Sequence, residues 1–356
     1  MRLSDRQPFR QIFRSFGSWL RHQAAPGAVL LATLGTGTPV FAQQAQAEAD
    51  EPEQDAVTFV FENDTWGTTS DRWYTSGQRL ILDRDPDKRD FASAGLDALG
   101  FDNPDRRILS LNQQIYTPEG IGHDQHADGS HPWAGWLGIT AGAAKERTSG
   151  AVDSIELSVG LTGPYSYAEE AQSAVHRVFD GVEPQGWHKQ LKTEPTFNVT
   201  VGRHWPGLGH LDLGSDVQFK ASPYVLGALG TWDRSATAGA LLSIGSTNDV
   251  TTARPDQAVQ GRGVLGLNNS GGGDFGWSVY AGGELRAVEW NGAISGNSFQ
   301  SSPSADLKNM VEEHYAGVEL RYRGTSFRAE GVKRSKEFDD QSENHRYLRL
   351  SVSRRF

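Results

Sequence analysis

Apolar and polar residues alternate along much of this 356-residue chain. The clearest apolar sets are Ile155, Leu157, Val159 and Leu161; Trp277, Val279, Ala281 and Leu285; Ala316, Val318, Leu320 and Tyr322; and Leu348, Leu350 and Val352. Side chains of a β-strand point alternately to its two faces, so this period of two predicts strands with one apolar face. The other face carries small or charged residues such as Glu319 and Arg349, which suit a wet lumen as well as a solvated sheet.

The alternation predicts twelve strands. They lie near residues 57–62, 72–85, 107–117, 134–146, 153–163, 194–205, 210–224, 235–246, 276–289, 311–323, 325–338 and 346–356. An even count is typical of bacterial outer-membrane barrels, whose two termini lie in the periplasm. The short turns at Trp205 to Gly209 and at Arg323 to Thr325 fall on that side, whereas the connections 86–106 and 247–275 are long for it.

The first 42 residues are predicted to be a signal peptide. Five arginines precede an apolar run at residues 28–34, and Val40-Phe41-Ala42 offers a cleavage site, although Ala45 or Ala47 would also serve. A membrane anchor is the less favoured alternative because the run is short and Pro39 breaks it. Residues 43–56 are acidic and polar and are expected to form a disordered arm. The barrel domain would then span 57–356.

The last residue favours a membrane barrel over a soluble β-sandwich, which would also alternate. The chain stops at Phe356 inside its final predicted strand, and outer-membrane barrels commonly end on such an aromatic residue, which their assembly machinery recognises. The expected fold is therefore an all-β, twelve-stranded antiparallel transmembrane barrel. One segment, 165–179, is predicted to be helical because Ser166 and Glu169 have capping-box spacing, and it would lie in an extracellular loop.

Composition narrows the possible chemistry. The mean hydropathy of -0.52 excludes a helical membrane protein but not a barrel, whose strands are apolar only at alternate positions. The absence of cysteine excludes disulfides and thiolate sites. A net charge of -10 argues against nucleic acid as a partner. An acidic chain beside an anionic membrane surface would need bridging divalent cations, so Ca²⁺ is a reasonable cofactor to expect.

Polar motifs from distant parts of the chain converge on one rim in this topology. The first strand ends at Glu62-Asn63-Asp64 and the second begins near Asp71. The third ends at Thr117-Pro118 and the fifth leads into the predicted helix, which carries His176. These groups all fall on the outer rim, whereas a random distribution of polar loop residues would divide between the two ends.

The ordered motifs resemble the calcium-dependent lipid A 3'-O-deacylases of Gram-negative outer membranes. The matching residues are Glu62-Asn63-Asp64, Tyr74-Thr75-Ser76-Gly77, Ile115-Tyr116-Thr117-Pro118, Ala134-Gly135-Trp136-Leu137, Gly163-Pro164, Glu169 to Gln172, His176-Arg177, Glu183 to Trp187, Gln190-Leu191-Lys192 and Glu194-Pro195. Each motif is short, but their order and spacing hold from about Val57 to His204. The resemblance implies a twelve-stranded barrel that hydrolyses the 3'-linked acyl-oxyacyl ester of lipid A at the outer leaflet.

By this resemblance, Asn63, Asp64, Thr75, His176 and Glu183 fall on active-site positions. His176 would act as the base that activates water, because imidazole titrates near neutrality. Asp64 and Glu183 offer hard oxygen ligands for Ca²⁺, which would polarise the ester carbonyl. Asn63 could add a ligand or an orienting hydrogen bond, and Thr75 could support either role.

Three departures from the family pattern stand out. Ser130-His131 replace an Asp-Arg pair found in many relatives, where the basic residue could contact a substrate phosphate. Gly122-His123 stand where a relative places an oxyanion-binding lysine. The spacing from His176 to Glu183 is one residue longer than in some relatives, which makes Glu183 the weakest assignment.

Several features have simpler interpretations. His123, Asp124, His126, Asp128 and His131 resemble a metal cluster but are expected to form a solvated loop, and Trp232, Trp277 and Tyr322 are expected at the membrane interfaces. Two functional alternatives also remain open. One is a calcium-dependent outer-membrane phospholipase, although no serine pairs with His176 in the sequence. The other is a non-catalytic pore or structural barrel.

Overall fold

The computed structural model describes residues 55–64, 71–84, 93–124, 129–178, 180–246, 251, 266 and 274–356. Its strands are β1 (Ala56–Asn63), β2 (Trp73–Arg84), β3 (Arg106–Thr117), β4 (Ala134–Glu146), β5 (Val152–Thr162), β6 (Pro195–His204), β7 (Gly209–Asp212), β8 (Val217–Gly230), β9 (Asp233–Ser246), β10 (Phe275–Asn291), β11 (Met310–Tyr322), β12 (Thr325–Arg334) and β13 (His345–Arg355). The α-helices are α2 (Ser93–Ala98), α3 (Ala168–Val178) and α4 (Gly292–Ser295), and the 3-10 helices are η2 (Gly163–Ser166) and η3 (Trp187–Lys189).

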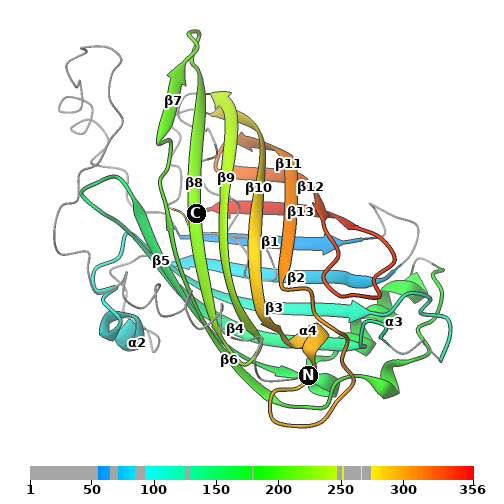
Figure 1. Cartoon of the computed structure of the whole chain (residues 1–356). Helices are drawn as coiled ribbons and strands as arrows, with labels where there is room; N and C mark the ends of the chain where they lie inside the picture. Colours follow the sequence, from blue (N-terminus) through cyan, green and yellow to red (C-terminus); the bar gives the residue numbers. More distant parts are fainter. Residues whose placement is uncertain are drawn as a thin grey trace. The chain divides into compact units, whose positions relative to one another are not determined.

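The strands form one antiparallel sheet that closes into a barrel (Figure 1). Neighbours along the sequence pair with each other, β1 pairs with β13, and β6 pairs with β8 to complete the ring. Closure gives the backbone N–H and C=O groups of the strands partners without exposed sheet edges. The predicted barrel class is confirmed, and its first strand starts at Ala56, one residue before the predicted boundary. The predicted signal peptide lies outside the described residues.

Twelve strand positions make up the ring, because β6 and β7 are one interrupted strand. Both pair antiparallel with β8, β6 through His204 and β7 from Gly209. The predicted turn at Trp205 to Gly209 is therefore wrong as a chain reversal. It is a break within the strand, where Gly207 has a φ of 59°. The chain reverses at residues 213–216 instead.

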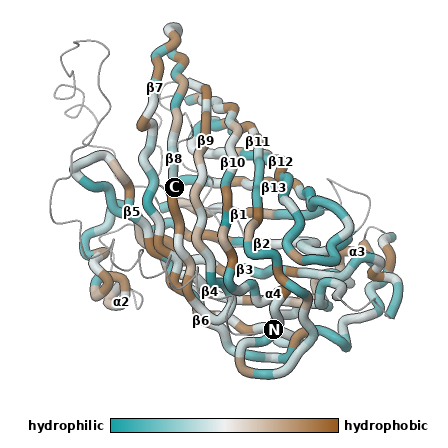
Figure 2. The backbone as a smooth tube through the Cα atoms, in the orientation of Figure 1, coloured by the Kyte–Doolittle hydropathy of each residue, from teal (hydrophilic) through white to brown (hydrophobic). Residues whose placement is uncertain are grey.

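The two faces of the sheet follow the predicted alternation. The apolar sets proposed from the sequence point outwards, and Leu320, Phe327 and Val352 form one exposed row across β11, β12 and β13. Arg349, one position from Leu348 and Leu350, is buried inside. Figure 2 shows the resulting mixture of apolar and polar residues along the strands. No helix in the described ranges is long and apolar enough to cross a membrane.

Buried ion pairs fill much of the lumen. Arg349 donates through Nε to Glu62 at 2.5 Å and also contacts Glu330, while Tyr74 donates its hydroxyl to Glu62. Arg334 contacts Glu313 at 2.5 Å. Nearer the start of β1, Arg79 pairs with Glu156 at 2.8 Å. Positive and negative side chains therefore neutralise each other along the interior.

Aromatic side chains from several strands also pack against one another inside the lumen. The cluster includes Tyr74, Tyr116, Trp136, Trp232, Tyr280, Tyr315 and Tyr347. Trp232 stacks on Trp136 with ring centroids 6.2 Å apart and donates Nε1–H to Gln114 at 3.3 Å. Its predicted place at the membrane interface is therefore wrong, because the tight turn between β8 and β9 directs the ring inwards. Tyr322 is exposed on the outer face, as expected.

We call the end of the barrel where β1 finishes the site rim, and the end where β1 begins the terminus rim. Figure 1 shows α3 near the site rim and α2 at the other end of the sheet. The helix α2 was not predicted, and its Leu96 packs with Phe101 on Ala143 and Ile155 of the outer wall. The predicted helix 165–179 is shorter at its start, because Ser166 belongs to η2 and its hydroxyl donates to the Gly163 carbonyl at 2.6 Å rather than capping α3.

Removing the charge of Arg349, which contacts two buried glutamates in the lumen, should destabilise the barrel. Arg349→Met leaves Glu62 and Glu330 buried without that partner, which should lower the free energy of unfolding by about 3–5 kcal/mol. Urea unfolding of the refolded barrel in lipid vesicles measures this. Arg354→Met on the same strand, an exposed position, is the matched control. Adding Glu62→Gln and Glu330→Gln should restore part of the lost free energy of unfolding, because the unpaired charges are then removed. If the Arg349→Met barrel is as stable as wild type, the ion pairs of Arg349 do not stabilise the fold.

Candidate active site

A β-bulge turns Thr75 towards the outside of the barrel. The register between β2 and β3 shifts between Tyr74 and Ser76, so Thr75 is an extra residue in β2. Tyr74 points into the lumen, whereas the Thr75 Oγ1 lies 2.7 Å from Oγ1 of Thr117, a residue on the outward positions of β3. A bulge re-aims one side chain without breaking the rest of the ladder. The threonine hydroxyl is thereby brought to the outer wall at the site rim.

Asn63 and Asp64 meet Thr75 at the end of β1. The Asn63 side chain donates Nδ2–H to the Thr75 carbonyl at 3.2 Å, and the Asp64 backbone N–H donates to the same oxygen at 3.1 Å. Asp64 is completely buried, and its Oδ2 accepts the backbone N–H of Arg72 at 2.8 Å. The structure thus brings together three of the five residues predicted from the sequence.

Burial makes the charged form of Asp64 costly. Desolvation, and secondarily the nearby charge of Asp71, raises the pKa of the Asp64 carboxyl well above its usual range. A group in this situation favours a bound proton or a bound cation. Hard oxygen donors therefore gather here in a setting where positive charge would be stabilising.

The helix α3 is seated directly on the outer wall. A Cβ at Gly135 of β4 would lie 2.0 Å from the Ser166 Oγ and 2.5 Å from the Ala168 Cβ, so only glycine allows this contact. Ile115, Trp133, Ala168 and Trp187 form a buried cluster between the wall and the helix. The motifs at Gly135 and Trp187 therefore serve to fix the helix that carries His176.

His176 lies between two acceptor oxygens. Its Nε2 is 2.5 Å from Asp71 Oδ2, and its Nδ1 is 2.5 Å from the Val182 carbonyl oxygen. A ring with both nitrogens facing acceptors is favoured as the doubly protonated imidazolium. The hydrogen bond to Asp71 is the main cause that raises the pKa of His176, against the opposing effect of partial burial.

Asp71 is the functional candidate that the sequence analysis did not single out. Its Oδ2 also accepts Nε2–H from Gln172 at 3.1 Å, and Gln172 Oε1 accepts the indole N–H of Trp187 at 2.9 Å. The chain Trp187, Gln172, Asp71 and His176 thus links two of the aligned motifs. The sequence signal for Asp71 is its position at the start of the second strand, just before the Tyr74-Thr75-Ser76-Gly77 stretch and on the same rim as the other motifs.

Glu183 is not gathered with the other predicted residues. It is exposed, in the segment that follows α3. The described ranges contain no group of three His, Asp or Glu residues placed to hold a metal ion. The Asn63, Asp64 and Thr75 group nevertheless has the oxygen donors that calcium prefers, which include amide, hydroxyl and main-chain oxygens as well as carboxylates. The Asp64 carboxylate and the Asn63 amide oxygen are donors of the kind that fits a calcium ion, and Glu183 stays a predicted further ligand.

The comparisons with known proteins place the fold and the family. A family model described as "Outer membrane protein LpxR" matches residues 28–356. The chain belongs to this family. It is therefore an outer-membrane β-barrel. Among solved structures, LpxR from Salmonella typhimurium is similar with a TM-score of 0.67 and 18% identity, covering 85% of this chain and all (100%) of that one.

A second solved structure has a lower TM-score. The β-domain of the Bordetella autotransporter BrkA gives a TM-score of 0.39 at 11% identity, over 85% of this chain and 98% of that one. No curated protein matches. At these identities, the structural likeness concerns the fold, so the roles of individual residues depend on the geometry described above.

In this LpxR-family chain, His131 is part of the packed interior rather than of a solvated loop. It is buried and stacks on Tyr116 with ring centroids 5.6 Å apart, and Phe338 lies edge-on to it at 5.6 Å. Burial lowers the pKa of His131 to about 4, so the imidazole is neutral at physiological pH. His131 therefore does not supply a positive charge at this position. His123 is exposed, and His126 and Asp128 lie outside the described residues.

Neutralising Asp71 should lower the pKa of His176. Asp71→Asn removes the charged acceptor at Nε2, so the midpoint of an NMR titration of the His176 ring in detergent should move to lower pH. Because the folded pKa is raised, the pair stabilises α3 fully below the ordinary histidine pKa, and this contribution is lost as pH rises through the raised value. Asp124→Asn, an exposed change on the same rim, is the control. An unchanged His176 midpoint in Asp71→Asn would rule out the pairing.

Proposed function

We propose that this chain is a lipid A deacylase that hydrolyses the 3'-linked acyl-oxyacyl ester of lipid A. Membership of the LpxR family and the sequence motifs support this substrate. The observation that carries the chemistry is the 2.5 Å contact between His176 and Asp71. Asp71 in turn lies close enough to Asp64 for its charge to raise the pKa of that carboxyl. A base placed there faces lipid rather than the lumen.

The proposed reaction is direct hydrolysis by water. Asp71 holds His176 through Nε2–H, which leaves Nδ1 as the atom that takes the proton from water. The hydroxide adds to the ester carbonyl carbon, the bond from that carbon to the sugar oxygen breaks, and the imidazolium returns its proton to the departing oxygen. The products are the free acyl-oxyacyl acid and a sugar hydroxyl.

This role requires Nδ1 to release to solvent the proton that it donates to the Val182 carbonyl, and then to accept a hydrogen bond from the reacting water instead. The Val182 carbonyl oxygen occupies the place of the water in the state shown, at 2.5 Å. Val182 lies in the exposed segment after α3, and Gly181 is packed so closely that a Cβ there would lie 2.8 Å from Nδ1. We propose that displacement of this segment admits the water, which couples the base to the position of the adjoining Glu183.

Asp64 and Glu183, with Asn63, are the proposed calcium ligands, and the ion when bound would supply positive charge to the ester carbonyl oxygen. The high pKa of Asp64 described above supports a cation at this position. Thr75 keeps Asn63 and Asp64 in place through its carbonyl oxygen, and its hydroxyl is held by Thr117.

We place the site rim on the extracellular side. The start of β1 and the end of β13 lie at the terminus rim, with the short reversals 147–151, 213–216 and 323–324 and two longer connections at 85–105 and 247–274. Longer connections, at 118–133, 163–194 and 292–309, lie at the site rim. Outer-membrane barrels have short periplasmic turns and longer extracellular loops. This orientation brings His176 to the level of the outer leaflet.

The two alternatives receive less support. A phospholipase of the serine type needs a serine hydroxyl at the histidine, and the described contacts of the His176 ring are with Asp71 and Val182. A pore needs an open lumen, and the described interior holds the ion pairs and aromatic cluster. Single-channel conductance and a phospholipid substrate would test these alternatives directly.

Mass spectrometry of lipid A from a Gram-negative host expressing this chain tests the proposed reaction. We expect loss of one acyl-oxyacyl unit, and a rate lower by about 100-fold or more in His176→Ala because the base is removed. His188→Ala is the matched control, since His188 is an exposed histidine on the same rim. Unchanged lipid A mass from a folded wild-type barrel would disprove the reaction, and full activity in His176→Ala would disprove the base.

Calcium should stabilise the barrel through Asp64. The unfolding temperature of the purified protein should rise with added Ca²⁺, because a ligand that binds the folded state stabilises it. Asp64→Asn should lose that rise, whereas Asp339→Asn, an exposed acid on the same rim, should keep it. An equal calcium effect in wild type and Asp64→Asn would exclude Asp64 as a ligand.

A further inference from the structure

A row of basic side chains crosses three strands on the outer wall. His314 of β11 pairs with Lys333 of β12, and Lys333 pairs with Arg346 of β13. All three are exposed on outward positions near the site rim. Within the described residues, neither Lys333 nor Arg346 takes part in an ion pair or side-chain hydrogen bond. In a chain with a net charge of -10, this is a local concentration of positive charge.

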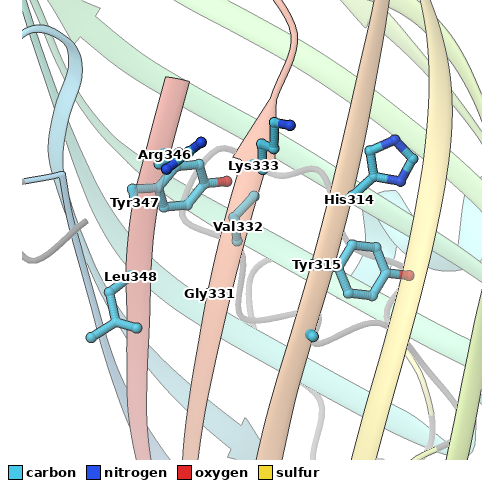
Figure 3. Close-up of a pocket in the computed structure, with 9 residues that line it drawn as sticks. His314, Tyr315, Gly331, Val332, Lys333, Arg346, Tyr347 and Leu348 are labelled. Atoms are coloured by element: carbon cyan, nitrogen blue, oxygen red, sulfur yellow. The ribbon is translucent and has the colours of Figure 1, made fainter. Parts of the chain in front are cut away.

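A groove lies against this row (Figure 3). It has a volume of about 360 Å³, and the next outward row, Ala316, Gly331 and Leu348, forms its floor. A Cβ built on Gly331 meets no atom within 4 Å, so the missing side chain leaves open space above β12. His314 borders the groove on the side of β10, where its Nδ1 would lie 3.1 Å from a Cβ at Gly283.

The position of the groove along the barrel matches the edge of a membrane. Below the floor, towards the terminus rim, the outward rows are apolar, first Val318, Ala329 and Leu350 and then Leu320, Phe327 and Val352. Successive outward residues are about 6.6–6.8 Å apart along a strand. Lys333 and Arg346 therefore lie at the boundary between the apolar outward rows and the charged residues of the site rim. In an outer-membrane barrel, this boundary lies at the level of the lipid headgroups.

The floor of the groove leads to the candidate active site. Leu348 pairs with Gly331 on one side and with Asn63 of β1 on the other. One register row thus runs Ala316, Gly331, Leu348 and Asn63 around the outer wall. An acyl chain lying in the groove would extend along the same face of the barrel that carries Asn63 and Thr75.

We propose that Lys333 and Arg346 bind a phosphate of the lipid A substrate while one of its acyl chains occupies the groove over Gly331. This inference rests on the proposed function. The occupant must combine an anionic headgroup with an apolar chain, because cations and an open apolar floor adjoin at the headgroup level. Lipid A has phosphates on a disaccharide that carries several acyl chains, and the continuity with Asn63 favours the substrate over an unrelated lipid. His131 is buried and neutral and therefore offers no positive charge to a phosphate, whereas Lys333 and Arg346 do.

Native mass spectrometry of the purified barrel tests the proposal in a His176→Ala background, where binding is separated from turnover. The probes are bisphosphorylated lipid A, dephosphorylated lipid A and phosphatidylglycerol. We expect Lys333→Gln with Arg346→Gln to weaken binding of bisphosphorylated lipid A by roughly tenfold or more. Binding of dephosphorylated lipid A should not change. Arg354→Gln, near the opposite end of β13, is the control for charge.

Filling the groove tests its apolar part independently of charge. Gly331→Leu has room and an ordinary backbone conformation, so the barrel should fold and lose lipid A affinity. Ala329→Leu, on the next outward position of β12, should not. In the protein with His176 intact, the double glutamine variant should raise KM for lipid A and leave kcat unchanged.

Three results of the binding experiment would overturn the inference. The first is equal lipid A binding in wild type and the double variant, and the second is an equal loss of binding with the Arg354→Gln control. The third is equal binding of phosphatidylglycerol with equal dependence on the two cations, which would indicate a general anionic-lipid contact. Deacylation with unchanged KM would also refute this site while leaving the proposed function intact. Conversely, binding that depends on the two cations in a protein that does not deacylate lipid A would refute the function and retain the site.

Discussion

Closure of the hydrogen-bonded ladder is the constraint from which the rest of the structure follows. Once β6 pairs with β8, the strands satisfy their backbone groups within the ring, and side chains can only alternate between lumen and outer wall. A single extra residue is then enough to move chemistry from one face to the other. The bulge at Thr75 does this, with Tyr74 left inside and the threonine hydroxyl delivered outside.

Because of the same alternation, the inner and outer faces of the barrel have different roles. The lumen is packed with compensating charges and aromatic rings, so it serves stability. The outer wall at the site rim carries α3, and the contact of Gly135 with Ser166 and Ala168 sets where His176 can reach. The candidate active site and the basic row at Lys333 and Arg346 then lie on the same outward face of the barrel, as the proposed membrane-embedded substrate would require.

The barrel was predictable from sequence because its signal is repeated in every strand, as in the alternation of Leu348, Arg349 and Leu350. Local irregularities were not: the break at Gly207 looks like a turn, and Trp232 looks like an interface residue until the β8–β9 reversal directs it inwards. The motifs singled out five candidate residues, of which the structure brings Asn63, Asp64 and Thr75 together and leaves Glu183 exposed apart from them. The sequence analysis did not identify Asp71 as a site residue, because its contact with His176 spans 105 positions and depends on how α3 packs.

We propose that ester hydrolysis takes place on the outer wall at the Thr75 bulge. The most direct measurement is an experimental structure of the His176→Ala barrel with calcium and intact lipid A bound. The account predicts the 3'-linked ester beside Asn63 and Thr75, on the lipid-facing side of β1 and β2, with Asp71 close to the vacated imidazole position. An ester bound in the lumen, or on a part of the wall away from α3, would contradict it.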